Sequence, residues 1–168
     1  LQVGSVPAGL NDSKKLSAKK RAALYESILT SANVGIGIAS VERIDRDNVL
    51  QATLWAMSEA VRALPSCPSA ALIDGNRAPQ LPCPAETLVK GDGRSLSIAA
   101  ASIVAKVTRD RIMAKLALDF PGYGWERNQG YGTPEHQKGI ELLGVTPNHR
   151  RSFRPIPLAL TCPAPSPA

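Results

Sequence analysis

Apolar residues recur at helical spacing in several parts of the chain. Ser17 is a good N-cap for a helix that ends at about Ala32. A second helix is predicted to open at Asp45 or Asp47, and Pro65 stops it. Its apolar positions step by four, three, four and three residues, as one face of a helix requires: Leu50, Leu54, Met57, Val61 and Leu64.

The second half of the chain predicts one long helix and one short helix. The long helix covers about residues 95–118 and is expected to pack against a sheet. Six small or apolar side chains can share its face: Ile98, Ala101, Ser102, Ala105, Ile112 and Leu116. Residues 122–131 are predicted to be a loop. Thr133 then caps a last helix, with Pro134 at its first position and Gly144 after its end.

Three stretches between these helices are typical of strands. Residues 34–41 alternate branched and small side chains, and residues 70–73 and 87–89 are short and apolar. Strands that alternate with helices predict an α/β fold, in which helices cover a sheet. Residues 161–168 are mostly Pro, Ala and Ser, which predicts a disordered tail after a single domain over residues 1–160.

The composition narrows the class of protein. The 168 residues are 43% hydrophobic and 20% charged, which is typical of one globular domain. No stretch approaches the roughly 18 apolar residues of a membrane helix. Cys67, Cys83 and Cys162 form no CxxC pair, so a structural zinc site is not expected. We expect these three cysteines to be reduced thiols in the cytoplasm. The 20 Lys and Arg against 14 Asp and Glu give a net charge of +6, which favours a polyanionic partner.

Two carboxylates stand where predicted strands end. Asp74 follows the first apolar strand, and Asp92 follows the next one. If the strands are neighbours, both side chains can face one hard divalent cation, for which carboxylate oxygens are suitable ligands. Asp-Gly is also a turn dipeptide, and spacing alone favours that simpler interpretation.

Groups suited to phosphate binding surround these acids in the sequence. They form three clusters: Asn11, Ser13, Lys14 and Lys15; Ser102, Lys106 and Arg109; and His149, Arg150, Arg151 and Ser152. Cations neutralise phosphates, and hydroxyl and amide groups position a nucleic-acid strand. For each cluster alone, a solvated charged face is the simpler interpretation. His136, in turn, is interpretable as a packed, hydrogen-bonded residue without a catalytic part.

Six segments together resemble one known family. They are Gly9–Leu16, Leu72–Asn76, Val89–Asp92, Ser97–Asp110, Gly130–His136 and His149–Phe153, and they closely resemble ribonuclease HII in order and spacing. The resemblance covers residues 9–160. It implies a ribonuclease H-like mixed sheet flanked by helices. It also implies hydrolysis of the RNA strand of RNA–DNA hybrids and cutting at ribonucleotides embedded in duplex DNA.

The resemblance also implies which residues act. The family holds Mg²⁺ or Mn²⁺ on four carboxylates, of which the third and fourth match Asp74 and Asp92. The residue that matches Tyr131 packs on the ribose at the junction and senses its 2′-hydroxyl group, which distinguishes RNA from DNA. Further matched residues lie near the substrate: Asn11, Ser13, Lys14, Lys15, Ser102 and Lys106.

The chain departs from the family at its beginning. The opening Gly-x-Asp-Glu-x-Gly-Arg-Gly segment, with two metal ligands, has no counterpart before Gly9. Gln129 also stands where the family usually has a lysine. We expect a fragment of a longer, monomeric enzyme that lacks the first strand or strands; a natural truncated product, or replacement of the ligands by Asp12 and Asp110, are the alternatives.

Two consequences are expected of such a chain. Two carboxylates hold a cation poorly, so the chain alone should have little or no hydrolytic activity. The lost strands should expose apolar surface near Ile36 and Ala101, which invites poor solubility or oligomers. The competing hypothesis is a non-catalytic nucleic-acid-binding module on the same scaffold, and a ribosome-associated basic protein is a weaker one.

Overall fold

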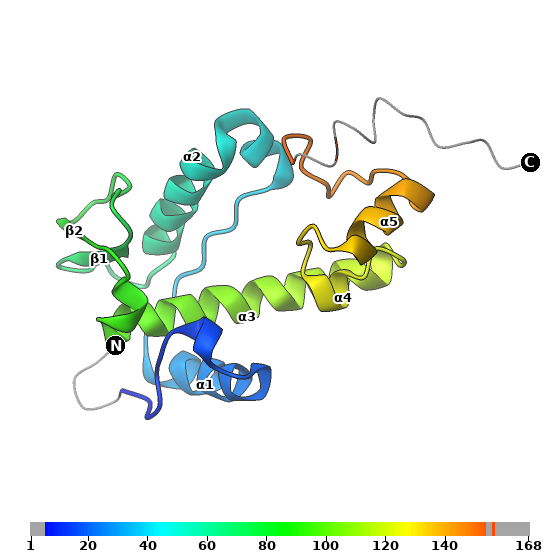
Figure 1. Ribbon diagram of the computed structural model, residues 1–168. Coiled ribbons are helices and arrows are strands. Elements are labelled where there is room, and N and C mark those ends of the chain that lie inside the picture. Colours follow the sequence, from blue (N-terminus) through cyan, green and yellow to red (C-terminus); the bar gives the residue numbers. More distant parts are fainter. Residues whose placement is uncertain (1–5, 154–155, 157–168) are drawn as a thin grey trace, which may run out of the picture. The chain divides into compact units, whose positions relative to one another are not determined.

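The structure is a computed structural model that describes residues 6–153 and 156 (Figure 1). Its elements, in chain order, are η1 (Ser13–Lys15), α1 (Ala18–Ser31), α2 (Val41–Arg62), β1 (Ala71–Asp74), β2 (Ala85–Leu88), η2 (Gly91–Gly93), α3 (Leu96–Asp119), α4 (Trp125–Asn128) and α5 (Pro134–Leu143). Contacts divide the chain into two compact units. The first comprises residues up to 39 together with 53–108, and the second comprises 40–52 with the residues from 109 onward. The tail predicted to be disordered lies outside the described residues.

The core of the first unit lies between α1 and α3. Ser17 caps α1 as predicted, because its hydroxyl accepts a hydrogen bond from the Lys20 N–H at 3.3 Å. One apolar face of α1 meets the side of α3 that contains Ile103, which is fully buried. The core consists of Leu16, Leu24, Tyr25, Ile28, Ala100, Ile103, Val104 and Val107.

The buried face of α3 differs in part from the predicted one. Ile98 is buried as predicted, together with Ala99 and Ala100, whereas Ala105 is exposed. Ala101 is also exposed, in line with the exposed apolar surface expected near it. The helix is apolar on more than one side, so periodicity alone did not determine which side is covered. α1 covers the side that carries Ile103.

The two strands form a parallel pair. β1 and β2 align Ala71 with Ala85 and Asp74 with Leu88, so their carboxyl ends lie at the same edge. Both were predicted within two residues of their observed bounds, and the α/β fold class is confirmed. In the part of the chain that the structure describes, this pair is the whole sheet.

The predicted strand over residues 34–41 is wrong. This segment runs between α1 and α2 without any strand partner among the described residues (Figure 1). Its glycines pack on α2 so closely that a Cβ at Gly35 would lie 2.0 Å from the Ala60 carbonyl oxygen. The intervening Ile36 and Ile38 are 39% and 59% exposed. The alternating pattern therefore describes a segment with one face on a helix and the other exposed.

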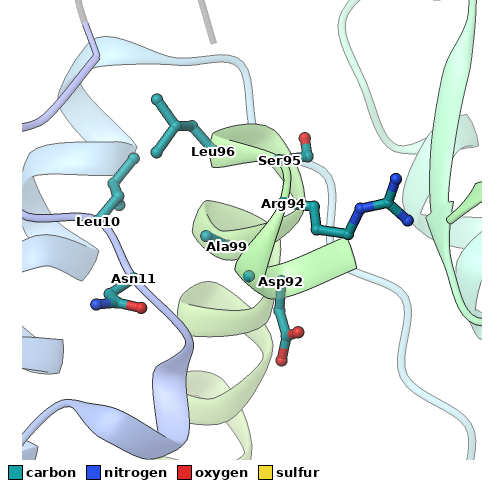
Figure 2. Close-up of a pocket in the computed structure, with 8 residues that line it drawn as sticks. Leu10, Asn11, Asp92, Arg94, Ser95, Leu96 and Ala99 are labelled. Carbon is teal, nitrogen blue, oxygen red and sulfur yellow. The ribbon is translucent and has the colours of Figure 1, made fainter. Parts of the chain in front are cut away.

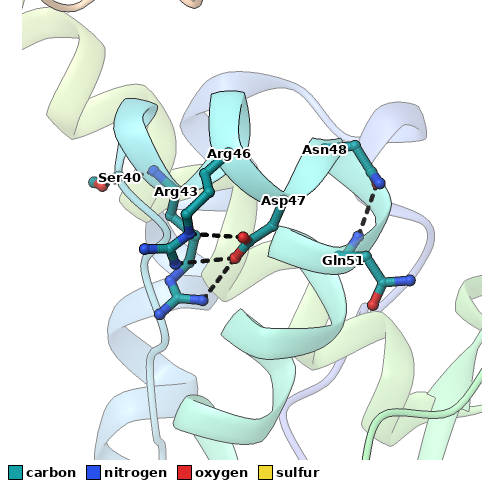
Figure 3. Close-up of polar contacts among 6 residues, drawn as sticks. All are labelled: Ser40, Arg43, Arg46, Asp47, Asn48 and Gln51. Carbon is teal, nitrogen blue, oxygen red and sulfur yellow. Dashed lines mark hydrogen bonds and ion pairs between the residues drawn. The ribbon is translucent and has the colours of Figure 1, made fainter.

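The start of α2, in the second unit, is also earlier than predicted. The helix begins at Val41, after Ser40, whose hydroxyl accepts a hydrogen bond from the Arg43 N–H at 3.3 Å. At Asn48 the backbone leaves the helical region with φ 67°, and the Asn48 side chain accepts hydrogen bonds from the N–H groups of Leu50 and Gln51 (Figure 3). Asn48 thus caps the stretch whose apolar periodicity the sequence shows. On the preceding turn, Arg43 pairs with Asp47 at 2.9 Å.

The core of the second unit is aromatic. Tyr123, Trp125, Ile140 and Ile156 are buried together, and the rings of Tyr123 and Trp125 stack with centroids 5.0 Å apart. Trp125 begins α4, a single turn inside the stretch predicted to be a loop. Helix α5 agrees with its prediction, because the Thr133 hydroxyl accepts a hydrogen bond from the His136 N–H at 3.3 Å.

Candidate functional site

The two predicted strand-tip acids meet at one edge of the sheet. Asp74 ends β1, and the Asp74 Oδ1 atom accepts a hydrogen bond of 2.8 Å from the Gly91 N–H. Gly91 directly precedes Asp92 in the short helix η2, which follows β2. Because the strands are parallel, both acids lie at the carboxyl end of the pair, which is where ligands bind in α/β sheets. Asp74 is exposed and Asp92 is half-buried.

The turn that carries Asp92 has little freedom. Lys90 adopts the left-handed conformation with φ 56°, which few non-glycine residues do. Gly91 is buried, and a Cβ there would lie 2.5 Å from Ile98 Cδ1 and 3.4 Å from Asp74 Oδ1. A side chain at position 91 would therefore displace the Ile98 side chain at the start of α3 and would touch Asp74.

Asp92 also lines a pocket of about 130 Å³ (Figure 2). Asn11 lies on the wall opposite the η2 turn, and Arg94 points away from it. The lining residues are Leu10, Asn11, Asp92, Gly93, Arg94, Ser95, Leu96 and Ala99. The structure therefore brings Asn11, a predicted substrate residue, to the pocket that contains one predicted metal ligand.

The Asn11–Lys15 segment has one buried and several exposed groups. Asp12 caps η1, with its carboxylate accepting a hydrogen bond from the Lys14 N–H at 2.9 Å. Ser13 is 7% exposed, and its carbonyl oxygen accepts a hydrogen bond from Arg21 at 2.8 Å. Lys14 and Lys15 are exposed. The two lysines are thus accessible to a polyanion, whereas most of Ser13 is covered.

Ser102 and Lys106 lie one turn apart on α3 in the same unit as Asp74 and Asp92. Both are half-buried, and the Ser102 hydroxyl donates to the carbonyl oxygen of Ala99 at 2.9 Å. That hydroxyl still has lone pairs with which to accept a hydrogen bond.

Tyr131 belongs to the second unit, and its ring is 62% exposed. The guanidinium carbon of Arg109 lies 5.3 Å from the centre of this ring, a cation–π distance. The backbone of Tyr131 is fixed on both sides. Its N–H donates to the Asn128 carbonyl at 2.9 Å, and its carbonyl accepts from the Thr133 N–H at 2.8 Å. The exposed ring is therefore presented from a rigid turn.

The third predicted phosphate cluster is only partly on the surface. His149 is 5% exposed, so it is not a surface phosphate ligand, which corrects the prediction. Arg151 and Ser152 are exposed, and both of their N–H groups donate to the carboxylate of Asp45, at 2.8 and 3.0 Å. Sequence periodicity had assigned Asp45 only to a helix start, and a bond spanning more than 100 residues leaves no local signal.

The two histidines of the chain form a buried pair. His136 is 2% exposed, and its Nε2 atom lies 3.1 Å from His149 Nε2. The prediction that His136 is packed and hydrogen-bonded is confirmed. Burial, and then the neighbouring His136, lowers the pKa of His149 to about 4.

Acidification is expected to destabilise the fold between about pH 6.5 and pH 4. Unfolded His149 takes up a proton near its ordinary pKa of 6.5, whereas the folded residue does so only near 4. The stabilisation is therefore complete above pH 6.5 and is lost as the pH falls towards 4, by on the order of 2–3 kcal/mol. Denaturant unfolding at several pH values measures this slope. His149→Asn, which does not titrate, should have a smaller slope, and an equal slope would contradict the assignment.

Comparisons with known proteins identify the family. A family model described as Ribonuclease HII matches residues 6–156. The chain belongs to the ribonuclease HII family. Ribonuclease HII of Ruegeria pomeroyi is 57% identical over 157 residues, which cover 93% of this chain and 67% of that protein. Ribonuclease HII of Magnetococcus marinus is 57% identical over 159 residues, covering 93% of this chain and 75% of that one.

A solved structure supports the fold. The ribonuclease H2 from Pyrococcus horikoshii OT3 matches with a TM-score of 0.78 and 21% identity, covering 90% of this chain and 80% of that one. The ribonuclease HII family consists of endonucleases that act on RNA–DNA substrates and depend on a divalent metal. The resemblance found in the six segments is thereby confirmed at the level of family, fold and enzyme class.

Few potential metal-ligating side chains come together in the described part of the chain. Asp74 and Asp92 offer hard oxygen ligands, the kind that Mg²⁺ and Mn²⁺ prefer. Among residues 6–153 and 156, however, no group of three or more His, Cys, Asp or Glu side chains is arranged to hold a metal ion. The two carboxylates are therefore suitable in kind for a hard cation. Nor does any described helix have the length and apolar character to cross a membrane.

Proposed function

We propose that this chain carries the Asp74 and Asp92 half of a ribonuclease HII active site. The proposed reaction is hydrolysis of the RNA strand of RNA–DNA hybrids and cutting at single ribonucleotides in duplex DNA. The observation that supports it best is the 2.8 Å hydrogen bond between Asp74 and the residue before Asp92. This bond holds the first acid against the turn that carries the second.

The proposed metal ligands are Asp74 and Asp92, and the proposed ion is Mg²⁺ or Mn²⁺. When bound, such ions stabilise charge on the attacking and leaving oxygens of a phosphodiester displacement. The proposed role of Asp74 and Asp92 is to hold their carboxylate oxygens at the sheet edge. Asp74 can do so because the Gly91 N–H fixes one of its oxygens and leaves the other available.

The proposed substrate contacts come from both units, each taken by itself. Lys14 and Lys15 are exposed cations that suit backbone phosphates, while Asn11 lines the pocket beside Asp92. Ser13, Ser102 and Lys106 complete the predicted set, in which the covered Ser13 serves through its place in the η1 turn. Tyr131 is proposed to pack on the ribose, because an exposed ring on a rigid turn can test for a 2′-hydroxyl by contact.

One observation favours a second candidate function. Because no described group of three acidic or other metal-ligating residues exists, the chain by itself fits a nucleic-acid-binding module that does not cut. Both functions rest on the basic charge of +6 and on the exposed lysines. We further propose that the protein is a monomer in the cytoplasm, where the free thiols of Cys67 and Cys83 would stay reduced.

Salt-dependent binding of a hybrid is expected of both functions. The 168-residue chain is expected to bind an RNA–DNA hybrid with an affinity that falls steeply as salt is raised, because phosphate contacts release counterions. Lys14→Gln with Lys15→Gln should weaken binding and reduce the salt slope by about two. Asp74→Asn should leave binding intact or strengthen it, since it removes a negative charge near the phosphates. Fluorescence anisotropy measures all three proteins, and salt-independent binding would contradict both functions.

A further inference from the structure

A buried polar network in the second unit ends on the backbone of Tyr131. His136 Nδ1 lies 3.0 Å from the carbonyl oxygen of Tyr131. On the other side of the same ring, His136 Nε2 is 3.0 Å from Trp125 Nε1 and 3.1 Å from His149 Nε2. Trp125, His136 and His149 are each at most 5% exposed, so water does not compete for the two bonds at His136 Nε2, while the bond to the Tyr131 carbonyl is partly buried.

The donors and acceptors of this network fit one arrangement of protons. The Thr146 N–H donates to His149 Nδ1 at 3.0 Å, so that nitrogen carries no proton and the proton of the neutral ring is on Nε2. His149 Nε2 therefore donates to His136 Nε2, which also accepts from the Trp125 N–H. His136 must then carry its proton on Nδ1, from which it donates to the Tyr131 carbonyl.

Among the described contacts of this turn, His136 provides the side-chain hydrogen bond to the Tyr131 carbonyl. Gly130, with φ 76°, and Gly132 flank the residue, so the rigidity of this turn comes from its hydrogen bonds rather than from its own side chains. Phe153 closes one side, since a Cβ at Gly132 would lie 3.2 Å from its ring. Backbone hydrogen bonds hold this turn, as do the Asn128 side chain at the Gly130 N–H and the Gln137 side chain at the Gly132 carbonyl. The His136 ring is the side chain that reaches the Tyr131 carbonyl itself.

We propose that His136 is a positioning residue for Tyr131: held by Trp125 and His149, it fixes the Tyr131 carbonyl and thereby the ring that contacts the ribose. The inference rests on the proposed role of Tyr131 in substrate recognition. His136 does not touch the substrate. It affects how well the chain distinguishes a ribonucleotide from a deoxyribonucleotide, because it holds the backbone of the turn that contains Tyr131.

The proton arrangement can be read directly in the unmodified chain. His136 and His149 are its two histidines, so long-range ¹H–¹⁵N spectra near neutral pH show two imidazoles. One ring is expected to be protonated on Nδ1 and the other on Nε2. If both rings were protonated on Nε2, His136 would be unable to donate to the Tyr131 carbonyl, and the inference would be wrong whatever the variants do.

Two substitutions at position 136 separate the hydrogen bond to the Tyr131 carbonyl from the contact with Trp125. His136→Asn can place an amide N–H near the former Nδ1 and so keep the donor to Tyr131. His136→Gln places its amide near the former Nε2, so it keeps a partner for Trp125 and loses that donor. Tyr123→Phe is the matched control, because it removes a part-buried hydrogen bond of 3.0 Å to the Gly144 carbonyl and leaves the ring that stacks on Trp125 and the His136 bond to Tyr131 in place.

Tyrosine signals report the position of the ring. The chain has three tyrosines, and Tyr25 lies in the other unit, so ¹³C-labelled tyrosine gives a probe and an internal check of folding. His136→Gln is expected to shift the Tyr131 signal toward that of an unrestrained ring while Tyr25 is unchanged. His136→Asn and Tyr123→Phe should leave Tyr131 near its original position. An unmoved Tyr131 in His136→Gln would overturn the inference.

Binding distinguishes this inference from the proposed function. The probes are a short DNA duplex with one ribonucleotide and the same duplex made of DNA alone. The ratio of their affinities is expected to fall about three- to tenfold in His136→Gln and to be retained in His136→Asn and Tyr123→Phe, in line with the loss of one hydrogen bond. If Tyr131→Ala lowers the ratio but His136→Gln does not, this inference alone fails. If Tyr131→Ala has no effect, the recognition role proposed for Tyr131 fails and the inference with it.

Discussion

The 168-residue chain is expected to cut an RNA–DNA hybrid at least about a thousandfold more slowly than the same chain joined, ahead of Leu1, to the Gly-x-Asp-Glu-x-Gly-Arg-Gly segment of a ribonuclease HII. The physical reason is the ligand count. Asp74 and Asp92 are held at one edge of the sheet. Two carboxylates are expected to hold two cations poorly and to leave the attacking water unplaced. A cleavage assay with a Mg²⁺ and a Mn²⁺ titration measures the difference.

Matched variants make this comparison decisive. In the joined protein, Asp74→Asn and Asp92→Asn should each abolish the gained activity while hybrid binding remains. Asp110→Asn should have little effect, because Asp110 lies on α3 and is not part of the predicted ligand set. Robust cutting by the 168-residue chain alone would refute the prediction and would indicate that other acids, such as Asp12, complete the site.

Gly37→Val is expected to lower the free energy of unfolding by about 3 kcal/mol or more. A Cβ at Gly37 would lie 1.9 Å from the Ala56 carbonyl oxygen and 2.8 Å from the Ala60 nitrogen. These are backbone atoms of α2, which cannot rotate away as a flexible side chain does. The helix or the segment must therefore move, and the contact between them is lost. Urea denaturation followed by circular dichroism measures the change.

Gly93→Ala serves as the control for this loss. A Cβ at Gly93 has no neighbour within 4 Å, and the residue does not adopt a positive φ. The change should therefore alter the stability by no more than about 0.5 kcal/mol. If Gly37→Val were as well tolerated as Gly93→Ala, the close packing of residues 34–38 on α2 would be incorrect.

Helices were predictable from the sequence where a cap and a period coincide. Ser17 and Thr133 each accept the expected hydrogen bond, and α1 and α5 begin one residue after them. Asn48 shows the limit of this reasoning. It caps the periodic part of α2, but the chain is already helical before it, because Ser40 starts an earlier turn. Local signals mark each start separately and do not say whether two helical stretches join.

Strands were harder to predict, because a strand is defined by its neighbour. The apolar runs before Asp74 and Asp92 paired with each other, and their parallel register brought the two acids together. The equally strand-like residues 34–41 met a helix instead, as the close approach of Gly35 and Gly37 to α2 shows. Alternation of small and branched residues predicts the two faces of the segment correctly but not what each face meets.

Some residues of the candidate site could be predicted from local sequence and others could not. Asp74 and Asp92 stood out because each follows an apolar strand, a pattern confined to a few residues of sequence. The buried pair of His136 and His149 did not, because their partners Trp125 and Thr146 come from different turns. His149 stands next to two arginines in the sequence and was grouped with them, although its ring is buried.

The uncovered isoleucines of residues 34–38 matter for every quantitative assay of this chain. Ile38 is 59% exposed, and Leu72 on β1 is 47% exposed. Self-association through such surfaces lowers the concentration of free chain, so the midpoint of a binding titration shifts with the total concentration of chain. Dissociation constants for this chain are therefore meaningful only when the titration is repeated at two or more dilutions and gives the same value.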